Sequence, residues 1–245
     1  MEALFSVITV TWNAVKVIAP TLASVKEQTF TGFEYLVVDG ASNDDTVRLV
    51  EAAGIDGTRI ISEPDNGLYD AMNKAIRLAK GKYLIWMNAG AAFAGTDSLA
   101  RMAAVADSNP GVIYGQTQIV DATRRVIGMR HLTAPEVLTA DSFKNGMMVC
   151  HQAFSARHDI APQYDLTYRF SADYEWCIRV LKASDHNAYV GDEPIISFLT
   201  EGLTDKNHKA SLKERYRIMC HYFGTIPTTL RHIRFAFRAL LRKLK

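Results

Sequence analysis

Short apolar segments alternate with amphipathic ones over the first hundred residues, and no other feature restricts the fold of this chain as strongly. The apolar segments are β-branched or aromatic and are bounded by turn residues, which predicts buried strands. These strands are expected over residues 5–10, 35–38, 59–62 and 83–87. Helical spacing between them predicts helices over residues 18–28, 44–53 and 68–79. The alternation indicates βαβ units, and therefore an α/β fold with a mainly parallel central sheet flanked by helices.

The pattern becomes less regular beyond residue 97. Further helices are expected over residues 97–107, 171–183, 209–223 and 228–244. Further strands are expected over residues 112–118, 126–129, 148–154, 187–190 and 195–199. No low-complexity linker and no internal repeat divides the chain. We therefore predict one α/β domain over residues 1–205 and a C-terminal extension of amphipathic helices over residues 206–245.

The composition excludes several classes of protein. With 245 residues, of which 48% are apolar and 22% charged, the chain can bury a substantial core. Its three cysteines, Cys150, Cys177 and Cys220, are odd in number and widely spaced, which suits a reducing compartment and predicts a cytoplasmic location. The first ten residues lack the basic region and cleavage site of a signal peptide. No apolar run approaches the roughly 18 residues of a membrane span.

Positive charge is concentrated at the C-terminal end. Residues 228–245 carry six Lys or Arg and no acid, whereas the first 227 residues carry 22 basic and 26 acidic groups. The body is therefore net acidic, and we expect no nucleic-acid partner. The last predicted helix has an apolar stripe that includes Leu230 and Ile233 beside a basic stripe that includes Arg231 and Arg234. This pattern is typical of a helix that lies on anionic lipid, so we predict peripheral contact with the inner face of the cytoplasmic membrane.

Polar residues follow the first two predicted strands. Thr11, Trp12 and Asn13 follow the first strand, and Asp39 follows the second. Ligands of parallel sheets bind at the carboxyl ends of the strands, so these residues are candidates for a binding site. Burying Asp39 unpaired would be costly, so it either accepts hydrogen bonds from a ligand or caps its own loop in an Asx turn. The chain has neither a Gly-x-Gly-x-x-Gly nor a Gly-x-x-x-x-Gly-Lys motif, which argues against a dinucleotide site and a P-loop.

A polar stripe follows the third predicted strand and continues into the next predicted helix. Asp65 precedes it, and its members are Asn66, Asp70, Asn73, Lys74 and Arg77. Helical spacing places most of them along one side of the helix and its entry. Such a stripe is also typical of a solvated helix face, but its combination with two other polar strand ends favours a site.

Three segments in this order resemble a known family. They are Ser-Val-Ile-Thr-Val-Thr-Trp-Asn (6–13), Val-Val-Asp-Gly-Ala-Ser-Asn-Asp (37–44) and Glu-Pro-Asp-Asn-Gly-Leu-Tyr-Asp-Ala-Met-Asn-Lys-Ala-Ile (63–76). Over residues 4–205 the chain is similar to family 2 of the inverting glycosyltransferases, which have the GT-A fold, and within it to bacterial enzymes of colanic-acid, capsule or lipopolysaccharide assembly. The resemblance implies that Thr11, Trp12 and Asp39 hold the base of a nucleotide-sugar donor. The other implied donor contacts are Asn13, Asp65, Asn66, Asp70, Asn73 and Lys74.

The fourth predicted strand ends in Asn88-Ala89-Gly90-Ala91, where the resemblance implies an Asp-x-Asp metal motif and this chain has no carboxylate. Asn88 and Gly90 are expected to contact the donor. One amide oxygen provides too few ligands for a divalent metal ion, so a cofactor such as Mg²⁺ or Mn²⁺ would be held largely by the donor diphosphate. The protein ligands of such an ion are unknown. The departing nucleoside diphosphate develops negative charge that a cation must stabilise. The candidate cationic side chains are Lys74, Lys206, His208 and Lys209.

Asp173 lies at the start of the helix predicted over residues 171–183, where the helix dipole favours a carboxylate and a plain capping role is one interpretation. The resemblance implies that Asp173 is the catalytic base, with Ala172 in place of the Glu of the family's Glu-Asp motif. Proton removal by a positioned carboxylate is worth roughly 10²- to 10⁴-fold. His151 and Gln152 match donor or acceptor contacts of the family, although a lone His on an apolar strand is more typical of a structural residue.

The sequence therefore predicts an inverting glycosyltransferase that moves a hexosyl group from a nucleotide sugar to a bacterial surface-polysaccharide intermediate. The expected acceptor is a glycan linked to polyprenyl diphosphate. One alternative is a catalytically inactive homologue that binds nucleotide sugars, because the metal motif is missing. Another is a nucleotidyltransferase, which shares the architecture, but this chain lacks the Gly-rich, basic first loop expected of one.

Overall fold

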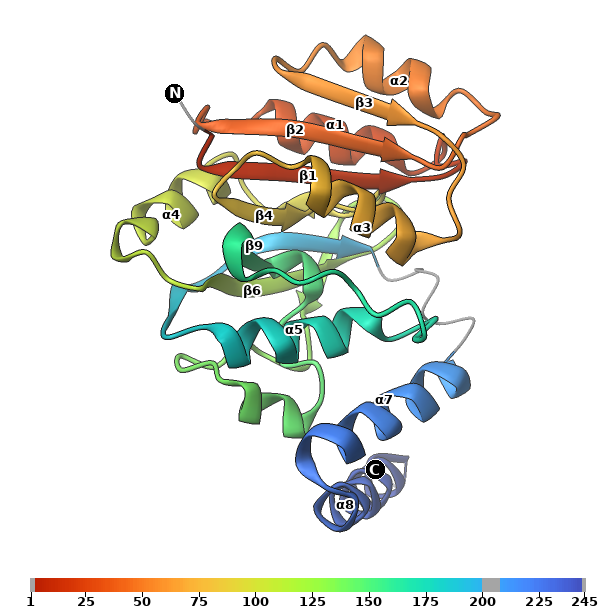
Figure 1. Cartoon of the computed structure of the whole chain (residues 1–245), viewed down its shortest axis with the longest axis vertical. Helices are drawn as coiled ribbons and strands as arrows, with labels where there is room; N and C mark the ends of the chain where they lie inside the picture. The colour runs from red at the N-terminus through yellow and green to blue at the C-terminus, as the bar shows by residue number, and fades with distance from the viewer. Residues whose placement is uncertain (1–2, 200–207, 244–245) are drawn as a thin grey trace.

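The computed structural model describes residues 3–199 and 208–243, and a nine-stranded mixed sheet forms the centre of this part of the chain (Figure 1). The strands are β1 (Phe5–Thr11), β2 (Phe33–Asp39), β3 (Thr58–Ser62), β4 (Tyr83–Trp86), β5 (Ala92–Phe93), β6 (Val112–Val120), β7 (Val126–Met129), β8 (Phe154–Arg157) and β9 (Asn187–Leu199). They lie in the order β3-β2-β1-β4-β8-β6-β9-β5, and β7 pairs with β6.

The first four strands make the parallel half of the sheet. β1 pairs with β2 and β4, and β2 pairs with β3, all in parallel register. In the other half β6 and β9 are parallel, whereas β8, β5 and β7 join the sheet as antiparallel strands. The predicted α/β fold with a mainly parallel sheet is confirmed. β5 and β8 are short, and their pairing partners are distant in sequence, which a local pattern does not reveal. β7 pairs with β6 in a local hairpin.

Helices cover both faces of the sheet. They are α1 (Ile18–Lys26), α2 (Thr46–Ala53), α3 (Leu68–Leu78), α4 (Ser98–Ala104), α5 (Ala172–Ala183), α7 (His208–Phe223) and α8 (Thr225–Lys243). In Figure 1, α1 lies behind the parallel strands and α3 lies in front of them. The apolar side of α3 is buried through Tyr69, Met72 and Ile76, whose spacing brings them to one face. The helices thereby bury the sheet and leave its strand ends as the place for a ligand.

Two segments differ from the sequence prediction. Residues 187–199 form one strand instead of two, because β9 continues through Gly191, which has a φ of +117°, while its pairing with β6 shifts register after Tyr114. The segment 148–154 is not one strand. His151–Ala153 form a short 3₁₀-helix, and β8 begins at Phe154. The predicted boundary at residue 205 lies outside the described residues.

Candidate active site

The loops after β1 and β2 are joined by hydrogen bonds. The side-chain oxygen of Asn13 accepts a bond from the Asn43 amide at 3.0 Å, and the Asn13 amide donates to Ser42 Oγ at 2.8 Å. The Ala14 amide donates to Thr46 Oγ1 at 2.8 Å. Asn13 therefore fixes the two loops relative to each other, and a ligand contact by its side chain stays a prediction.

Asp39 ends β2 and is buried. Its carboxylate accepts hydrogen bonds from the Ser42 amide at 2.8 Å, from Ser42 Oγ at 2.5 Å and from Ser62 Oγ at 2.7 Å. The structure thus contains the local turn that was one of the two interpretations of Asp39. The bond to Ser62 also ties the ends of β2 and β3 together, so the carboxylate holds the carboxyl ends of these two strands in place.

Three strand ends converge around Gly40. A Cβ atom at Gly40 would lie 2.5 Å from Asp65 Oδ2 and 3.4 Å from Trp12 Cδ1, so the two side chains press against the bare backbone of this residue. The Trp12 side chain is 68% exposed, which is unusual for an indole and leaves its face available for stacking. Beside it, the hydroxyl of Thr11 is buried and has no hydrogen-bond partner in the described part of the chain. The structure therefore brings Thr11, Trp12, Asp39 and Asp65 together.

The loop after β3 is shaped by its own acidic residues. Asp65 accepts a hydrogen bond from the Gly67 amide at 2.8 Å, and Asp70 accepts one from the Asn66 amide at 2.9 Å. Lys74 Nζ lies 3.0 Å from Glu63 Oε1 and donates to the Pro64 carbonyl oxygen at 2.7 Å. The bonds of Asp65 and Asp70 hold residues 65 and 66 at the end of β3. The ammonium of Lys74 is already bonded to Glu63 and Pro64 in the same loop.

Asn73 lies apart from these residues. Its side chain is 3% exposed, donates to the Tyr164 carbonyl oxygen at 3.0 Å and accepts from the Tyr164 amide at 2.6 Å. Both ends of the Asn73 amide are therefore used to hold the segment before α5 against α3. This position explains why a polar residue occurs on the buried side of the helix.

Asp173 lies in the first turn of α5 and contacts α3. Tyr69 donates its hydroxyl proton to Asp173 Oδ1 at 3.1 Å, across 104 residues of sequence. Burial, followed by the charge of Asp173, raises the pKa of Tyr69 well above its usual value, so the phenol stays protonated and remains a donor. Tyr69 lies four residues after Asp65 in the sequence. Its hydrogen bond therefore places Asp173, the predicted base, beside the loop after β3. Sequence reasoning missed Tyr69, because its position on the apolar side of α3 made it a core residue.

A cluster of aromatic rings connects α5 to β4. Trp86 of β4 packs against His151 at 5.7 Å and against Trp176 at 6.3 Å between ring centroids, and Tyr164 stacks on Trp176 at 5.0 Å. His151 Nε2 lies 2.8 Å from the Tyr164 hydroxyl. Burial lowers the pKa of His151 to about 4, so the ring is neutral at pH 7. The structural interpretation of His151 therefore accounts for all of its contacts in the described chain.

Gln152 and Cys150 lie next to this aromatic cluster. The Gln152 side-chain oxygen accepts a hydrogen bond from Cys150 Sγ at 2.9 Å. Burial raises the pKa of the Cys150 thiol, which keeps it protonated and unreactive. One cation that the sequence did not single out, the partly buried guanidinium of Arg130, interacts electrostatically with the carboxylate of Asp173.

The turn after β4 does not fit a divalent cation. Asn88 Oδ1 is buried there without a hydrogen-bond partner among the described residues, and Gly90 turns the chain with a φ of +98°. The Gly90 amide is held by Thr21 Oγ1 at 3.0 Å. No group of three or more His, Cys, Asp or Glu residues that could hold a metal ion occurs in residues 3–199 and 208–243. Mg²⁺ and Mn²⁺ prefer several hard oxygen ligands, and a single amide oxygen does not supply them.

The remaining predicted cations are Lys206, His208 and Lys209. Lys206 and the side chain of His208 lie outside the described residues, and Lys209 is exposed on α7.

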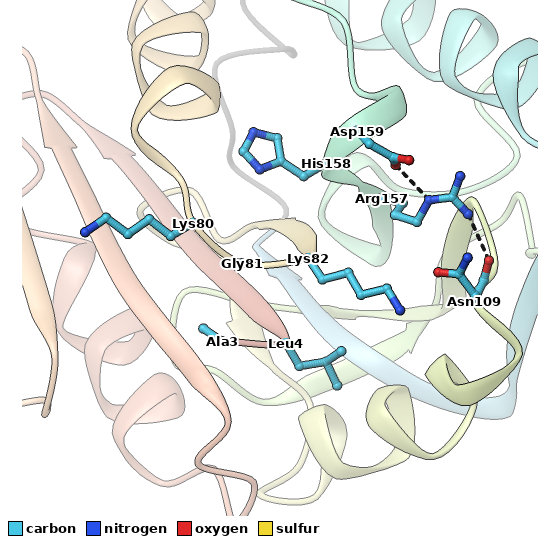
Figure 2. Close-up of a pocket in the computed structure, with 9 residues that line it drawn as sticks. All are labelled: Ala3, Leu4, Lys80, Gly81, Lys82, Asn109, Arg157, His158 and Asp159. Atoms are coloured by element: carbon cyan, nitrogen blue, oxygen red, sulfur yellow. Dashed lines mark hydrogen bonds and ion pairs between the residues drawn. The ribbon is translucent and has the colours of Figure 1, made fainter. Parts of the chain in front are cut away.

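Figure 2 shows a separate pocket of about 660 Å³ at the amino ends of β1 and β4, on the opposite edge of the sheet. It contains none of the predicted site residues. Its Arg157 is already bonded to Asp159 at 2.7 Å and to the Asn109 carbonyl oxygen at 2.9 Å.

The sheet order and the polar strand ends define a GT-A-type glycosyltransferase fold. Among solved structures, S. aureus TarS in complex with UDP-GlcNAc superposes with a TM-score of 0.73 at 20% sequence identity, over 89% of this chain and 64% of the TarS chain. A family model described as Glycosyl transferase family 2 matches residues 6–163. The chain belongs to this family and is a glycosyltransferase, as its three motifs predicted.

Relatives known by sequence support the same assignment. The chain is 35% identical over 185 residues to a PGL/p-HBAD biosynthesis glycosyltransferase of Mycobacterium bovis, covering 72% of this chain and 69% of the relative. It is 23% identical over 189 residues to the UDP-Glc:alpha-D-GlcNAc-diphosphoundecaprenol beta-1,3-glucosyltransferase WfgD of Escherichia coli, covering 76% and 73% of the two chains.

Proposed function

We propose that this protein is an inverting glycosyltransferase that moves a hexosyl group from a nucleotide sugar to a lipid-linked glycan. The observation that carries the proposal is the hydrogen bond between Tyr69 and Asp173. This bond holds the Asp173 carboxylate beside the loop after β3, which contains Asp65. The convergence of Trp12 and Asp65 at Gly40 supplies an exposed aromatic face and a carboxylate for the donor at the same edge of the sheet.

In the proposed reaction Asp173 removes the proton of an acceptor hydroxyl as that oxygen attacks the anomeric carbon of the donor. The bond from that carbon to the diphosphate breaks, and the nucleoside diphosphate leaves with the electron pair. A single displacement inverts the configuration at the anomeric carbon. Tyr69 orients the Asp173 carboxylate through one of its oxygens and leaves the other for the acceptor.

The acceptor is proposed to be a surface-polysaccharide intermediate on polyprenyl diphosphate at the inner face of the cytoplasmic membrane. Support comes from WfgD, which by its name acts on a diphosphoundecaprenol-linked sugar. It also comes from α8, on which Ile226, Leu230 and Ile233 are exposed. Among the described residues, no helix combines the length and hydropathy needed to cross a bilayer. We propose a peripheral association through the exposed apolar side chains of α8.

The test of the base is Asp173→Asn, with Asp185→Asn as a matched control on the exposed segment after α5. A thermal-shift screen with UDP, GDP and dTDP sugars identifies the donor, and transfer is measured with membrane extracts as the source of lipid-linked acceptor. We expect D173N to lose roughly 100-fold or more of the transfer rate while its affinity for the donor stays within about twofold. Transfer by D173N at the rate of D185N would remove Asp173 from the mechanism.

A second candidate function is a catalytically silent nucleotide-sugar-binding protein. The observation that favours it is the turn after β4, where the described residues offer no ligand set for a metal. Turnover of the donor, measured with and without EDTA, separates the two candidates. Turnover in either condition excludes the silent protein. Binding of the donor without any turnover, in the presence of acceptor and of Mg²⁺ or Mn²⁺, would favour it.

A further inference from the structure

A hairpin from the far half of the sheet reaches the turn after β4. The hairpin joins β6 to β7, and Arg124 lies at its tip with a φ of +66°. Arg124 Nη1 donates a hydrogen bond to the Gly90 carbonyl oxygen at 2.8 Å. A guanidinium therefore lies at the position in the fold where the family resemblance implies a metal ion, and where this chain has lost the carboxylates.

The hairpin tip is held in one conformation by Asp121. Its Oδ1 accepts bonds from the Thr123 amide at 2.9 Å, from Thr123 Oγ1 at 2.6 Å and from the Arg125 amide at 3.1 Å. The Arg124 amide donates to the Asp121 carbonyl oxygen at 2.9 Å. The backbone beneath the Arg124 side chain is thus fixed before any ligand arrives, which reduces the entropy that binding would cost.

The two neighbouring arginines of this hairpin have different surroundings. Arg125 has a side chain that is 80% exposed and lies 3.5 Å from the Asp121 carboxylate. Arg124 is partly buried, and its only acceptor within the described residues is the Gly90 carbonyl oxygen, with no carboxylate paired to it. Burial lowers the pKa of Arg124, yet a guanidinium stays charged at neutral pH. A fixed, partly desolvated cation with unused N–H donors is a ready partner for an anion.

The other described residues that contact Gly90 are neutral. A Cβ atom at Gly90 would meet Val17 at 3.8 Å and Leu199 at 3.9 Å, and Thr21 binds the Gly90 amide. Asn88 adds one unpartnered amide oxygen. In the parallel register of β1 and β4, Ile8 pairs with Trp86, so the Asn88–Gly90 turn lies level with the end of β1 that carries Trp12. Arg124 therefore lies at the same edge of the sheet as the proposed donor site.

We propose that Arg124 binds the diphosphate of the donor and takes the place of the metal ion in this chain. The inference rests on the proposed function, because it assigns a group to the same donor. When the acceptor oxygen bonds to the anomeric carbon, the carbon–oxygen bond to the diphosphate breaks and the electron pair stays on the phosphate oxygen. Arg124 donates hydrogen bonds to that oxygen and its neighbours, while Asp173 takes the acceptor proton.

The experiment compares Arg124→Gly, Arg124→Lys and the matched control Arg125→Gln by calorimetric titration in EDTA. Glycine accepts a φ of +66° without strain, so R124G removes the side chain with little effect on the hairpin. The probes are UDP, GDP or dTDP, whichever stabilises the wild type most, and the corresponding nucleoside. We expect R124G to bind the diphosphate about 10- to 100-fold more weakly and the nucleoside within about twofold. R124K falls between, and R125Q matches the wild type.

Two results would overturn the inference: unchanged diphosphate affinity in R124G, or wild-type affinity that is lost in EDTA and restored by Mn²⁺. Thermal melting of each variant verifies folding. If R124G has a lower melting temperature than the wild type, the diphosphate affinity of R124K provides the test instead. The outcomes are distinct from those for the base. If Arg124-dependent binding occurs without sugar transfer, the proposed function fails and the inference stands. If transfer depends on Asp173 but is unaffected in R124G, the function stands and the inference fails.

Discussion

At the scale of single residues, burial has a large effect on the ionisation of His151. Its ring is enclosed by Trp86, Trp176 and Tyr164, and within the described residues the ring forms its hydrogen bond with the Tyr164 hydroxyl. Burial favours its neutral form, and the carboxylate of Asp173 only partly opposes that effect. The pKa of about 4 in the folded chain lies below the usual 6.5, so protonation is harder in the folded state than in the unfolded one.

The consequence is a loss of stability in acid. Because the pKa of His151 is lowered on folding, its contribution is fully present above pH 6.5 and is lost as the pH falls toward 4. The full effect is about 3 kcal/mol. We expect the urea midpoint of the wild type to fall between pH 7.5 and pH 5, and that of His151→Phe, which keeps an aromatic ring, to fall less. Parallel pH profiles for the two proteins would contradict the assignment of this effect to His151.

At the scale of elements, the link between α3 and the segment before α5 decides where Asp173 lies. The link has two parts, the Tyr69 hydroxyl on Asp173 and the Asn73 amide on the backbone of Tyr164. The Asn73 bonds are buried, so removing the amide leaves a backbone N–H and a C=O of Tyr164 without partners. Such groups are costly to bury alone.

Asn73→Ala therefore tests the role of this residue. We expect a loss of about 1 to 3 kcal/mol in the free energy of unfolding, measured in urea, because two buried backbone groups lose their partners. Arg77→Ala, on the exposed side of the same helix, is the control and is expected to have the stability of the wild type. Equal midpoints for the two variants, with weaker donor binding in N73A alone, would instead support the donor contact that the family resemblance implies.

The elements themselves were largely predictable, because β1 to β4 and their helices follow period-2 and period-3.6 patterns that depend on local sequence. The convergence of the strand ends was predictable for the same reason, since parallel strands bring Trp12 and Asp39 to one edge. The partners of those residues were not predictable. Tyr69 and Asp173 are 104 residues apart, and the hydrogen bond from Arg124, in the β6–β7 hairpin, to Gly90 is a tertiary contact.

At the scale of the whole molecule, α8 extends the chain beyond the sheet and lies at its lower end in Figure 1. Ile226, Leu230 and Ile233 recur at helical spacing, and they are 75%, 63% and 61% exposed. Arg231, on an adjoining side, donates to Asn145 Oδ1 at 2.8 Å and so fastens the helix to the body. The start of α8 therefore presents an apolar face, and Arg234 beside that face is exposed.

We expect the protein to sediment with vesicles that contain phosphatidylglycerol, and to bind vesicles of phosphatidylcholine alone more weakly, because apolar burial and cation–lipid attraction act together. Replacing Ile226, Leu230 and Ile233 together by Ser should weaken vesicle binding roughly tenfold or more, since the apolar area is lost. Val137→Ser, at a 77% exposed residue outside α8, is the control. If the triple variant sediments like V137S, α8 is not the membrane contact.

The parallel half of the sheet has a consequence for how activities in this family can be recombined. β1 to β4 come from one uninterrupted stretch of chain, whereas Asp173 is supplied by a helix from the later part. Under the proposed function, recognition of the nucleotide base and activation of the acceptor are thus encoded in consecutive blocks, and Arg124 belongs to the second. A hybrid gene joined just after β4 would exchange the first block alone, provided that Trp86 and the rings it meets across the junction are kept as a matched set.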